Sequence, residues 1–142
     1  MTVNTQCVLC TTAIESHAPL FFDCHFTSSV WNVVLSRSGI SRTSLPLEQE
    51  LYWAGCHRKG KSFIGVIYKI SLAATVYLLW VERNLRIFQH KRRDLEGVMT
   101  AILEAIRAKL SSLSSIKFSA RNRDLCDDWF LDFRIFGINN CE

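Results

Sequence analysis

The chain has 142 residues, a mass of 16.3 kDa, a formal net charge of +4 and 49% hydrophobic residues. This length suits one domain that buries a core without covalent cross-links, and the few glycines and prolines exclude a collagenous, low-complexity or disordered chain. The hydrophobic share is slightly high for a free-standing domain, so we expect a segment outside this chain to cover part of its apolar surface.

The amino end lacks the charged and apolar regions of a secretory signal, since it reads MTVNTQCVLC. We therefore expect a nuclear or cytoplasmic chain that is not secreted. In a reducing compartment, six cysteines indicate free thiols or metal ligands before disulfides.

Cysteine spacing predicts a zinc site in this first segment. Cys7 and Cys10 have the spacing with which two thiolates bind one Zn²⁺ from a tight knuckle. Cys24 and His17 would complete a set of Cys7, Cys10, His17 and Cys24. His25 competes with His17 for the fourth place, and Cys24 can alternatively be a thiol of the core.

The apolar stretch that follows predicts a short helix. Residues 27–29 are its candidate N-caps, and the helix is expected to end at Ser38 and Gly39. The stretch 38–61 is predicted to be an irregular connector, in which 47–53 can form one or two helical turns.

Residues 62–88 predict a long helix, because proline is absent and glycine does not recur after Gly65. Its part 63–81 is long and apolar enough to be tested as a membrane span. Lys69 near the centre disfavours that interpretation, so we expect a helix buried on most sides in a bundle. Trp80 is expected in the core, and Glu82 and Arg86 are expected to pair one turn apart.

The clearest periodicity belongs to the next helix, for which Asp94 is the expected N-cap. Its apolar positions, three or four residues apart, are Leu95, Val98, Met99, Ile102, Ile106, Leu110 and Leu113. A last short helix within 121–130 would place Leu125, Trp129 and Phe133 on one side.

These patterns predict a mainly α fold: a small zinc-knuckle-like amino-terminal segment followed by a helical bundle with two long helices. The predicted organisation is one domain, with its parts at 1–37, 38–61, 62–133 and a fraying tail at 134–142.

Positive charge is concentrated in residues 82–123, which hold ten basic and four acidic residues. His90, Lys91, Arg92 and Arg93 fall between the two long helices. Such a run is either a solvated loop or a contact to the phosphate backbone of RNA or DNA, which Lys91, Arg92 and Arg93 would position without reading bases.

Several separated motifs resemble the zinc-binding domain that follows the reverse transcriptase in plant non-long-terminal-repeat retrotransposons. The motifs are Cys7-x2-Cys10, Ile14-Glu15-Ser16, Leu20-Phe21-Phe22-x-Cys24-x-Phe26, Val30-Trp31, Trp80-x-Glu82-Arg83-Asn84-x-Arg86-x-Phe88, Ile106-Arg107-x-Lys109-Leu110-Ser111-Ser112-Leu113 and Asn122-Arg123-x-Leu125-Cys126-x-x-Trp129. The resemblance covers roughly residues 7–130. It implies that the chain binds zinc and functions in association with nucleic acid.

The chain departs from the family pattern in two ways. Pro19 stands where family members carry a histidine, and proline has no ligating side-chain atom, so His17 is the substitute we expect. Family domains also begin with a helical stretch before the first cysteine pair, so we expect this chain to be truncated at its amino end relative to the family.

Catalytic motifs are weak. Asp127 and Asp128 are not preceded by the tyrosine of a polymerase signature, the chain holds no phosphate-binding glycine loop, and Cys56 beside His57 has no evident orienting acid. We therefore expect a non-catalytic zinc- and nucleic-acid-associated module without a small-molecule substrate. The alternatives are a degenerate structural fragment and, third, a membrane protein through 63–81.

Overall fold

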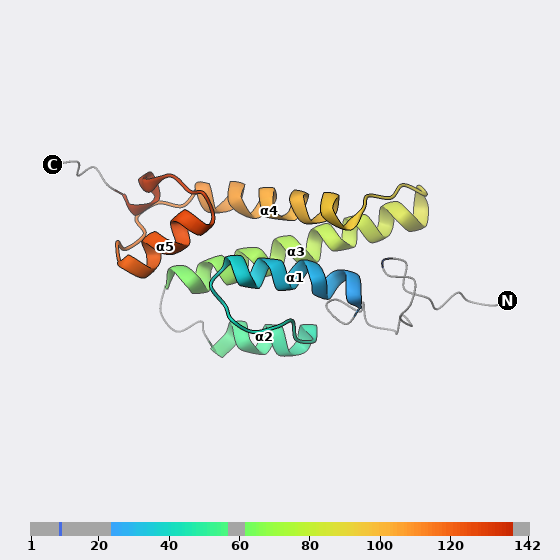
Figure 1. Cartoon of the computed structure of the whole chain (residues 1–142), viewed down its shortest axis with the longest axis horizontal. Helices are drawn as coiled ribbons and strands as arrows, with labels where there is room; N and C mark the ends of the chain where they lie inside the picture. The colour runs from blue at the N-terminus through green and yellow to red at the C-terminus, as the bar shows by residue number, and fades with distance from the viewer. Residues whose placement is uncertain (1–8, 10–23, 57–61, 138–142) are drawn as a thin grey trace.

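The computed structural model describes residues 9, 24–56 and 62–137. Within them the chain forms five α-helices and one 3-10 helix and no β-strand, which confirms the mainly α fold class (Figure 1). The predicted zinc knuckle lies almost entirely outside the described residues. The helices are α1 His25–Arg37, α2 Leu47–Cys56, α3 Phe63–Phe88, α4 Leu95–Ser111, α5 Ala120–Asp128 and the 3-10 helix η1 Phe133–Phe136.

The scaffold is the antiparallel pair α3 and α4, which run side by side and share the most extensive contact between elements (Figure 1). With 26 residues α3 is about 39 Å long. Ser62 and Asp94 cap the two helices by accepting hydrogen bonds from the backbone N–H of Gly65 and Gly97. The predicted periodicity of α4 is confirmed, since every fourth residue of its inner face, Val98, Ile102, Ile106 and Leu110, is fully buried.

Helix α1 packs against both α3 and α4 and buries Val30, Trp31 and Val34. Its start differs from the prediction, because Cys24 is the N-cap and 27–29 lie inside the helix. The Cys24 sulfur accepts a hydrogen bond from the Thr27 backbone N–H at 3.5 Å, and the Thr27 hydroxyl donates to the Cys24 carbonyl at 3.2 Å. Thr27 is therefore buried in the first turn instead of capping it.

Helix α2 occupies a stretch for which an irregular connector was predicted. It runs for ten residues to Cys56, past the expected end at Trp53, because Gly55 adopts helical backbone geometry without interrupting the helix. Its most extensive contact with another helix is to α3.

The carboxyl end is more ordered than a fraying tail from 134 would be. Leu125 and Trp129, which were predicted to share one side of a last short helix with Phe133, are both buried, whereas Phe133 is 45% exposed and belongs to the next helix. The 3-10 helix η1 follows, with Ile135 and Phe136 buried, and the Ile116 N–H donates to the Ile135 carbonyl at 2.8 Å. The tail prediction is therefore wrong for 134–137, and 138–142 lie outside the described residues.

Helix α3 is not buried on most sides. Its length and composition would allow it to cross a membrane, and 39% of its most apolar stretch is buried within the molecule. Tyr77 is 64% exposed and Trp80 is 42% exposed, so the expectation that Trp80 lies in the core is wrong. One face of α3 contacts α1 and α4, and another is open to solvent.

Candidate functional site

Of the four predicted zinc ligands, Cys24 is the one that the structure describes, whereas Cys7, Cys10 and His17 lie outside the described residues. The Cys24 side chain is 1% exposed at the amino end of α1, with its sulfur 3.3 Å from the Thr27 hydroxyl oxygen. Negative charge on a ligating sulfur is favoured at this end of a helix, where backbone N–H groups point outward. The position suits a metal ligand and a core thiol equally.

His25, the alternative fourth ligand, is exposed, whereas the adjacent Cys24 is buried. The two side chains therefore lie in different environments. Within the described ranges, no three His, Cys, Asp or Glu side chains are close enough together to hold a metal ion. The zinc site stays a prediction.

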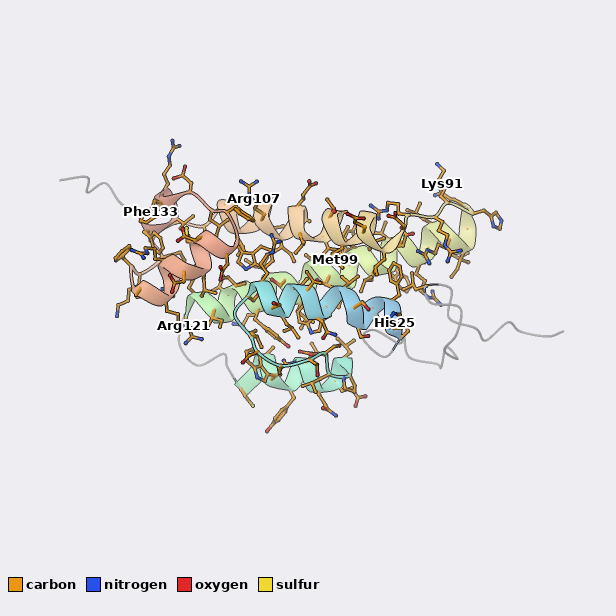
Figure 2. The ribbon with its side chains drawn as sticks, in the orientation of Figure 1. His25, Lys91, Met99, Arg107, Arg121 and Phe133 are labelled. Carbon is orange, nitrogen blue, oxygen red and sulfur yellow. The ribbon has the colours of Figure 1, made fainter. Side chains whose placement is uncertain are left out.

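The predicted phosphate-binding residues lie in the turn between α3 and α4. Lys91 and Arg92 are exposed there, and Figure 2 shows Lys91 extending from one end of the molecule. The turn is closed by the Lys91 N–H, which donates to the Leu85 carbonyl at 3.1 Å, and by His90, whose φ of 51° is left-handed. Two positive side chains are thus presented to solvent on an ordered turn.

Arg93 differs from its two neighbours because it contacts a buried carboxylate. Its Nε lies 3.1 Å from Glu82 Oε2, and its backbone N–H donates to Glu82 Oε1 at 2.9 Å. The Arg93 side chain is still 41% exposed. Arg93 therefore holds the turn against α3, and a contact to phosphate would be an additional role.

Glu82 is fully buried and receives three hydrogen bonds. The third comes from Arg86 Nε at 2.9 Å, which confirms the predicted pair one turn apart. Burial alone would raise the pKa of the Glu82 carboxyl, but the hydrogen bonds from the Arg93 backbone and from both guanidinium groups bring the pKa below its ordinary value. Glu82 is thus a buried carboxylate that pairs with two arginines and offsets one of their two positive charges.

Arg86 joins three segments of the chain at this end. Its Nη1 donates to the Leu9 carbonyl at 3.0 Å, its Nη2 donates to the Arg93 carbonyl at 2.8 Å, and its guanidinium lies 4.9 Å from the centre of the Phe26 ring. Leu9 stands between Cys7 and Cys10 in the sequence. Sequence reasoning found the Glu82–Arg86 pair from its spacing but not these long-range contacts.

A second buried carboxylate lies between α2 and α3, and sequence reasoning missed it. Glu50 accepts hydrogen bonds from Arg42 at 2.9 and 2.8 Å, from the Leu45 N–H at 2.9 Å and from the Tyr68 hydroxyl. Burial opposes ionisation, but these donors lower the pKa of Glu50, while burial and the same carboxylate raise the pKa of Tyr68. Trp53 packs on Tyr68 with ring centres 4.3 Å apart. This cluster fixes α2 and is closed to ligands.

The candidate catalytic pair gains no support, because Cys56 is exposed at the end of α2 and His57 lies outside the described residues.

Fold and site together define a helical protein with an ordered basic turn at one end, and the Leu9 carbonyl accepts a hydrogen bond from Arg86 of α3 beside that turn. No protein-family model, curated protein or solved structure matches the chain. The family resemblance described above therefore stays a prediction.

Proposed function

We propose that the chain is a non-catalytic, retrotransposon-derived module that binds zinc through its amino-terminal cysteines and holds a nucleic-acid backbone at the α3–α4 turn. One observation carries the proposal: Arg86 donates to the Leu9 carbonyl and to the Arg93 carbonyl. The segment with the cysteine pair and the basic turn therefore meet at one guanidinium group.

Zinc would be held by Cys7, Cys10, His17 and Cys24, with His25 as the alternative to His17. Its chemistry there would be structural, because four protein ligands close the coordination sphere and bound metal contributes folding free energy. Lys91 and Arg92 would contact phosphates of RNA or DNA through charge alone, with no base-specific contact.

Metal content tests the first half of the proposal. The purified chain should contain about one zinc per molecule, and Cys7→Ser with Cys10→Ser should lose it. Comparing His17→Ala with His25→Ala identifies the fourth ligand, because only substitution of the ligating histidine should lower the affinity for zinc. A metal-free chain that folds equally well with and without added zinc would leave the degenerate structural fragment as the better interpretation.

Binding of a fluorescent single-stranded RNA tests the second half. Affinity should fall steeply between about 50 and 200 mM salt, and Lys91→Ala with Arg92→Ala should weaken binding and flatten the salt slope by about one unit per lost contact. The matched control is Lys117→Ala with Arg123→Ala, since both side chains are exposed elsewhere on the protein. Equal losses in the two double variants would contradict a specific role for the turn.

A further inference from the structure

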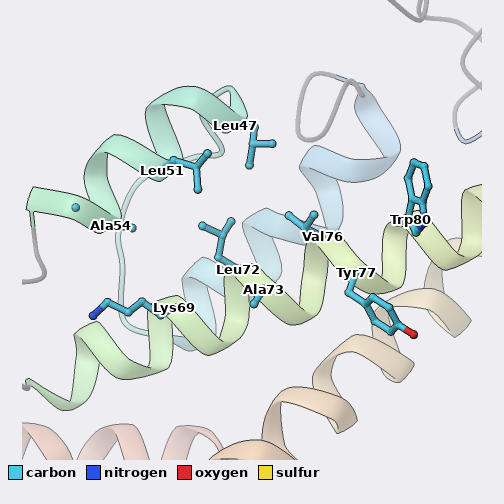
Figure 3. A pocket seen from close by; sticks show the side chains of 10 residues that line it. Leu47, Leu51, Ala54, Lys69, Leu72, Ala73, Val76, Tyr77 and Trp80 are labelled. Atoms are coloured by element: carbon cyan, nitrogen blue, oxygen red, sulfur yellow. The ribbon is translucent and has the colours of Figure 1, made fainter. Parts of the chain in front are cut away.

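A solvent-open hollow of about 320 Å³ lies along about the last three turns of α3 and ends beside the basic turn. Three aromatic residues, Tyr77, Trp80 and Phe88, line it together with the amide residues Asn84 and Gln89. Tyr77 and Trp80 also line a larger groove of about 750 Å³ between α2 and α3 (Figure 3). The smaller hollow differs from that groove because amide residues interrupt its apolar lining.

Phe88 presents the most exposed aromatic ring of this hollow. It is 75% exposed, against 64% for Tyr77 and 42% for Trp80. The Arg83 guanidinium lies 5.7 Å from the centre of the Trp80 ring, whereas the Phe88 ring contacts no other aromatic ring within the described part of the chain. An aromatic face open to solvent is the kind of surface on which an unpaired nucleobase stacks.

The basic turn is attached directly to the wall of the hollow. The carbonyl of Leu85, a lining residue, accepts hydrogen bonds from the N–H groups of Gln89 and Lys91, both at 3.1 Å. Phe88 and Lys91 therefore lie on one closed turn, and both are exposed (Figure 2 shows Lys91). Phosphates held by Lys91 and Arg92 would bring the attached bases to the Phe88 end of the hollow.

The acidic residues near this end of the molecule do not line the hollow. Glu82 is buried against Arg86 and Arg93. Asp94 caps α4 by accepting a hydrogen bond from a backbone N–H of the first turn, on which Glu96 also lies. Since none of the described lining residues is charged, a bound strand would place its bases against rings and amides and its phosphates against the basic turn.

The amide residues favour a nucleobase over a lipid surface as the occupant. If the hollow entered a lipid layer, the amides of Asn84 and Gln89 would lose water without gaining a partner, which costs free energy. A base edge carries donors and acceptors, and a side-chain amide also carries both. The hollow can therefore accommodate different bases without selecting one.

We propose that Phe88 stacks on an unpaired base of the strand whose phosphates contact Lys91 and Arg92, so that the ligand is single-stranded nucleic acid. This inference rests on the proposed nucleic-acid function and names its substrate class. A duplex keeps its bases inside the double helix, so it would contact Lys91 and Arg92 but leave Phe88 without a partner. Stacking tolerates different sequences because every base has a flat face.

A strand that keeps its phosphates but lacks its bases separates stacking from backbone contact. Fluorescence anisotropy should show oligothymidylate binding about tenfold (about 1.4 kcal/mol) more tightly than an abasic DNA strand of equal length. Phe88→Leu should abolish this difference while still binding the abasic strand, which a misfolded variant would not do. Phe88→Tyr should keep the difference, because it keeps the ring.

The two proposals fail in different ways. Equal affinities for the two strands, with the salt dependence and the loss in Lys91→Ala with Arg92→Ala retained, would overturn stacking and leave the backbone contact in place. Absence of binding to either strand would overturn the proposed nucleic-acid function and stacking together.

A duplex and a second exposed ring test the assignment to Phe88. Phe88→Leu should weaken binding of oligothymidylate about tenfold and leave binding of a blunt-ended duplex unchanged. Tyr52→Leu is the matched control, since Tyr52 is also 75% exposed but lies on α2, outside the hollow. Equal losses for strand and duplex, or an equal loss in Tyr52→Leu, would overturn the assignment. Loss of binding to phosphatidylserine vesicles in Phe88→Leu, with oligothymidylate binding unchanged, would overturn it in favour of a membrane.

Discussion

Glu50 and Glu82 are both fully buried and both paired with arginine, but they connect the molecule differently. The partners of Glu50 are Arg42, Leu45 and Tyr68, so its cluster fixes α2 and the loop before it onto α3. Glu82 contacts Arg86 and Arg93, and Arg86 extends the network to Leu9. The first cluster therefore joins neighbouring segments between Arg42 and Tyr68, whereas the second reaches from α3 back to Leu9.

The arginines also differ in their access to water. The Arg42 side chain is 24% exposed, whereas the Arg86 side chain is 7% exposed. A charge that loses its partner can turn to solvent in the first case, but in the second it stays buried at a high free-energy cost. Equal burial of two carboxylates therefore does not imply equal cost of removing them.

The largest expected effect is that of Glu82→Ala. Removing one partner of a buried pair takes the carboxylate away from both Arg86 and Arg93, so we expect the free energy of unfolding to fall by about 3–5 kcal/mol. Urea denaturation followed by circular dichroism measures it. The control is Glu104→Ala, an exposed glutamate on α4, which should stay within about 0.5 kcal/mol of the unsubstituted chain. Similar losses in both variants would contradict the structural role of Glu82.

Glu50→Ala should cost less, about 1.5–3 kcal/mol, because Arg42 can be hydrated when its hydrogen bonds to the carboxylate are lost. The loss should also be local. Hydrogen exchange of the α2 amides should accelerate, while the α4 amides at Ile102 and Ile106 keep their protection. Uniform acceleration across α2 and α4 would show instead that the Glu50 cluster is as central as that of Glu82.

Local sequence signals predicted the scaffold well. The helix Leu95–Ser111 was predictable because its apolar residues recur at helical intervals and Asp94 stands before them as the N-cap. Ser62 caps α3 in the same way, by accepting a hydrogen bond from a backbone N–H of the first turn. The Glu82–Arg86 pair was predictable because both residues lie one turn apart on one helix. In these cases the interacting residues are close in the sequence.

The errors concern contacts that depend on the tertiary fold. Trp80 reads as a core residue, but the face on which it lies is left uncovered in the folded chain. Arg42 and Tyr68 are 26 residues apart and meet only at Glu50, so no spacing rule links them. The carboxyl end resembled a tail because Ile135 and Phe136 are buried by packing that local composition does not encode. Of the candidate site, the exposure of Lys91 and Arg92 was predictable, but the Arg93–Glu82 contact was not.

Acid should weaken both carboxylate clusters, and the isosteric variants Glu82→Gln and Glu50→Gln measure how much each cluster contributes to the acid sensitivity of the chain. The folded-state pKa of each carboxyl lies below its ordinary value of 4.5, so its contribution to stability is fully present above that value and is lost as the pH falls through the folded-state pKa. Stability of the chain should therefore decline below about pH 4.5. Glu82→Gln and Glu50→Gln should each show a shallower decline than the unsubstituted chain in denaturant titrations between pH 7 and pH 3. An unchanged slope in either variant would assign the acid sensitivity to other groups.

The smallest effect should come from Gly55→Ala, which tests whether α2 depends on more than the Glu50 cluster. Gly55 is helical, and a Cβ added there would meet no heavy atom within 4 Å, so alanine fits without strain. Replacing helical glycine by alanine stabilises a helix by up to about 1 kcal/mol, and we expect less here because Gly55 is next to the last residue of α2. Hydrogen exchange of the α2 amides should slow in Gly55→Ala. In Glu50→Ala the same glycine substitution should not restore protection, because helix propensity cannot replace the contact that attaches α2 to α3. Full restoration would show that α2 is limited by its own helical stability and not by its buried glutamate.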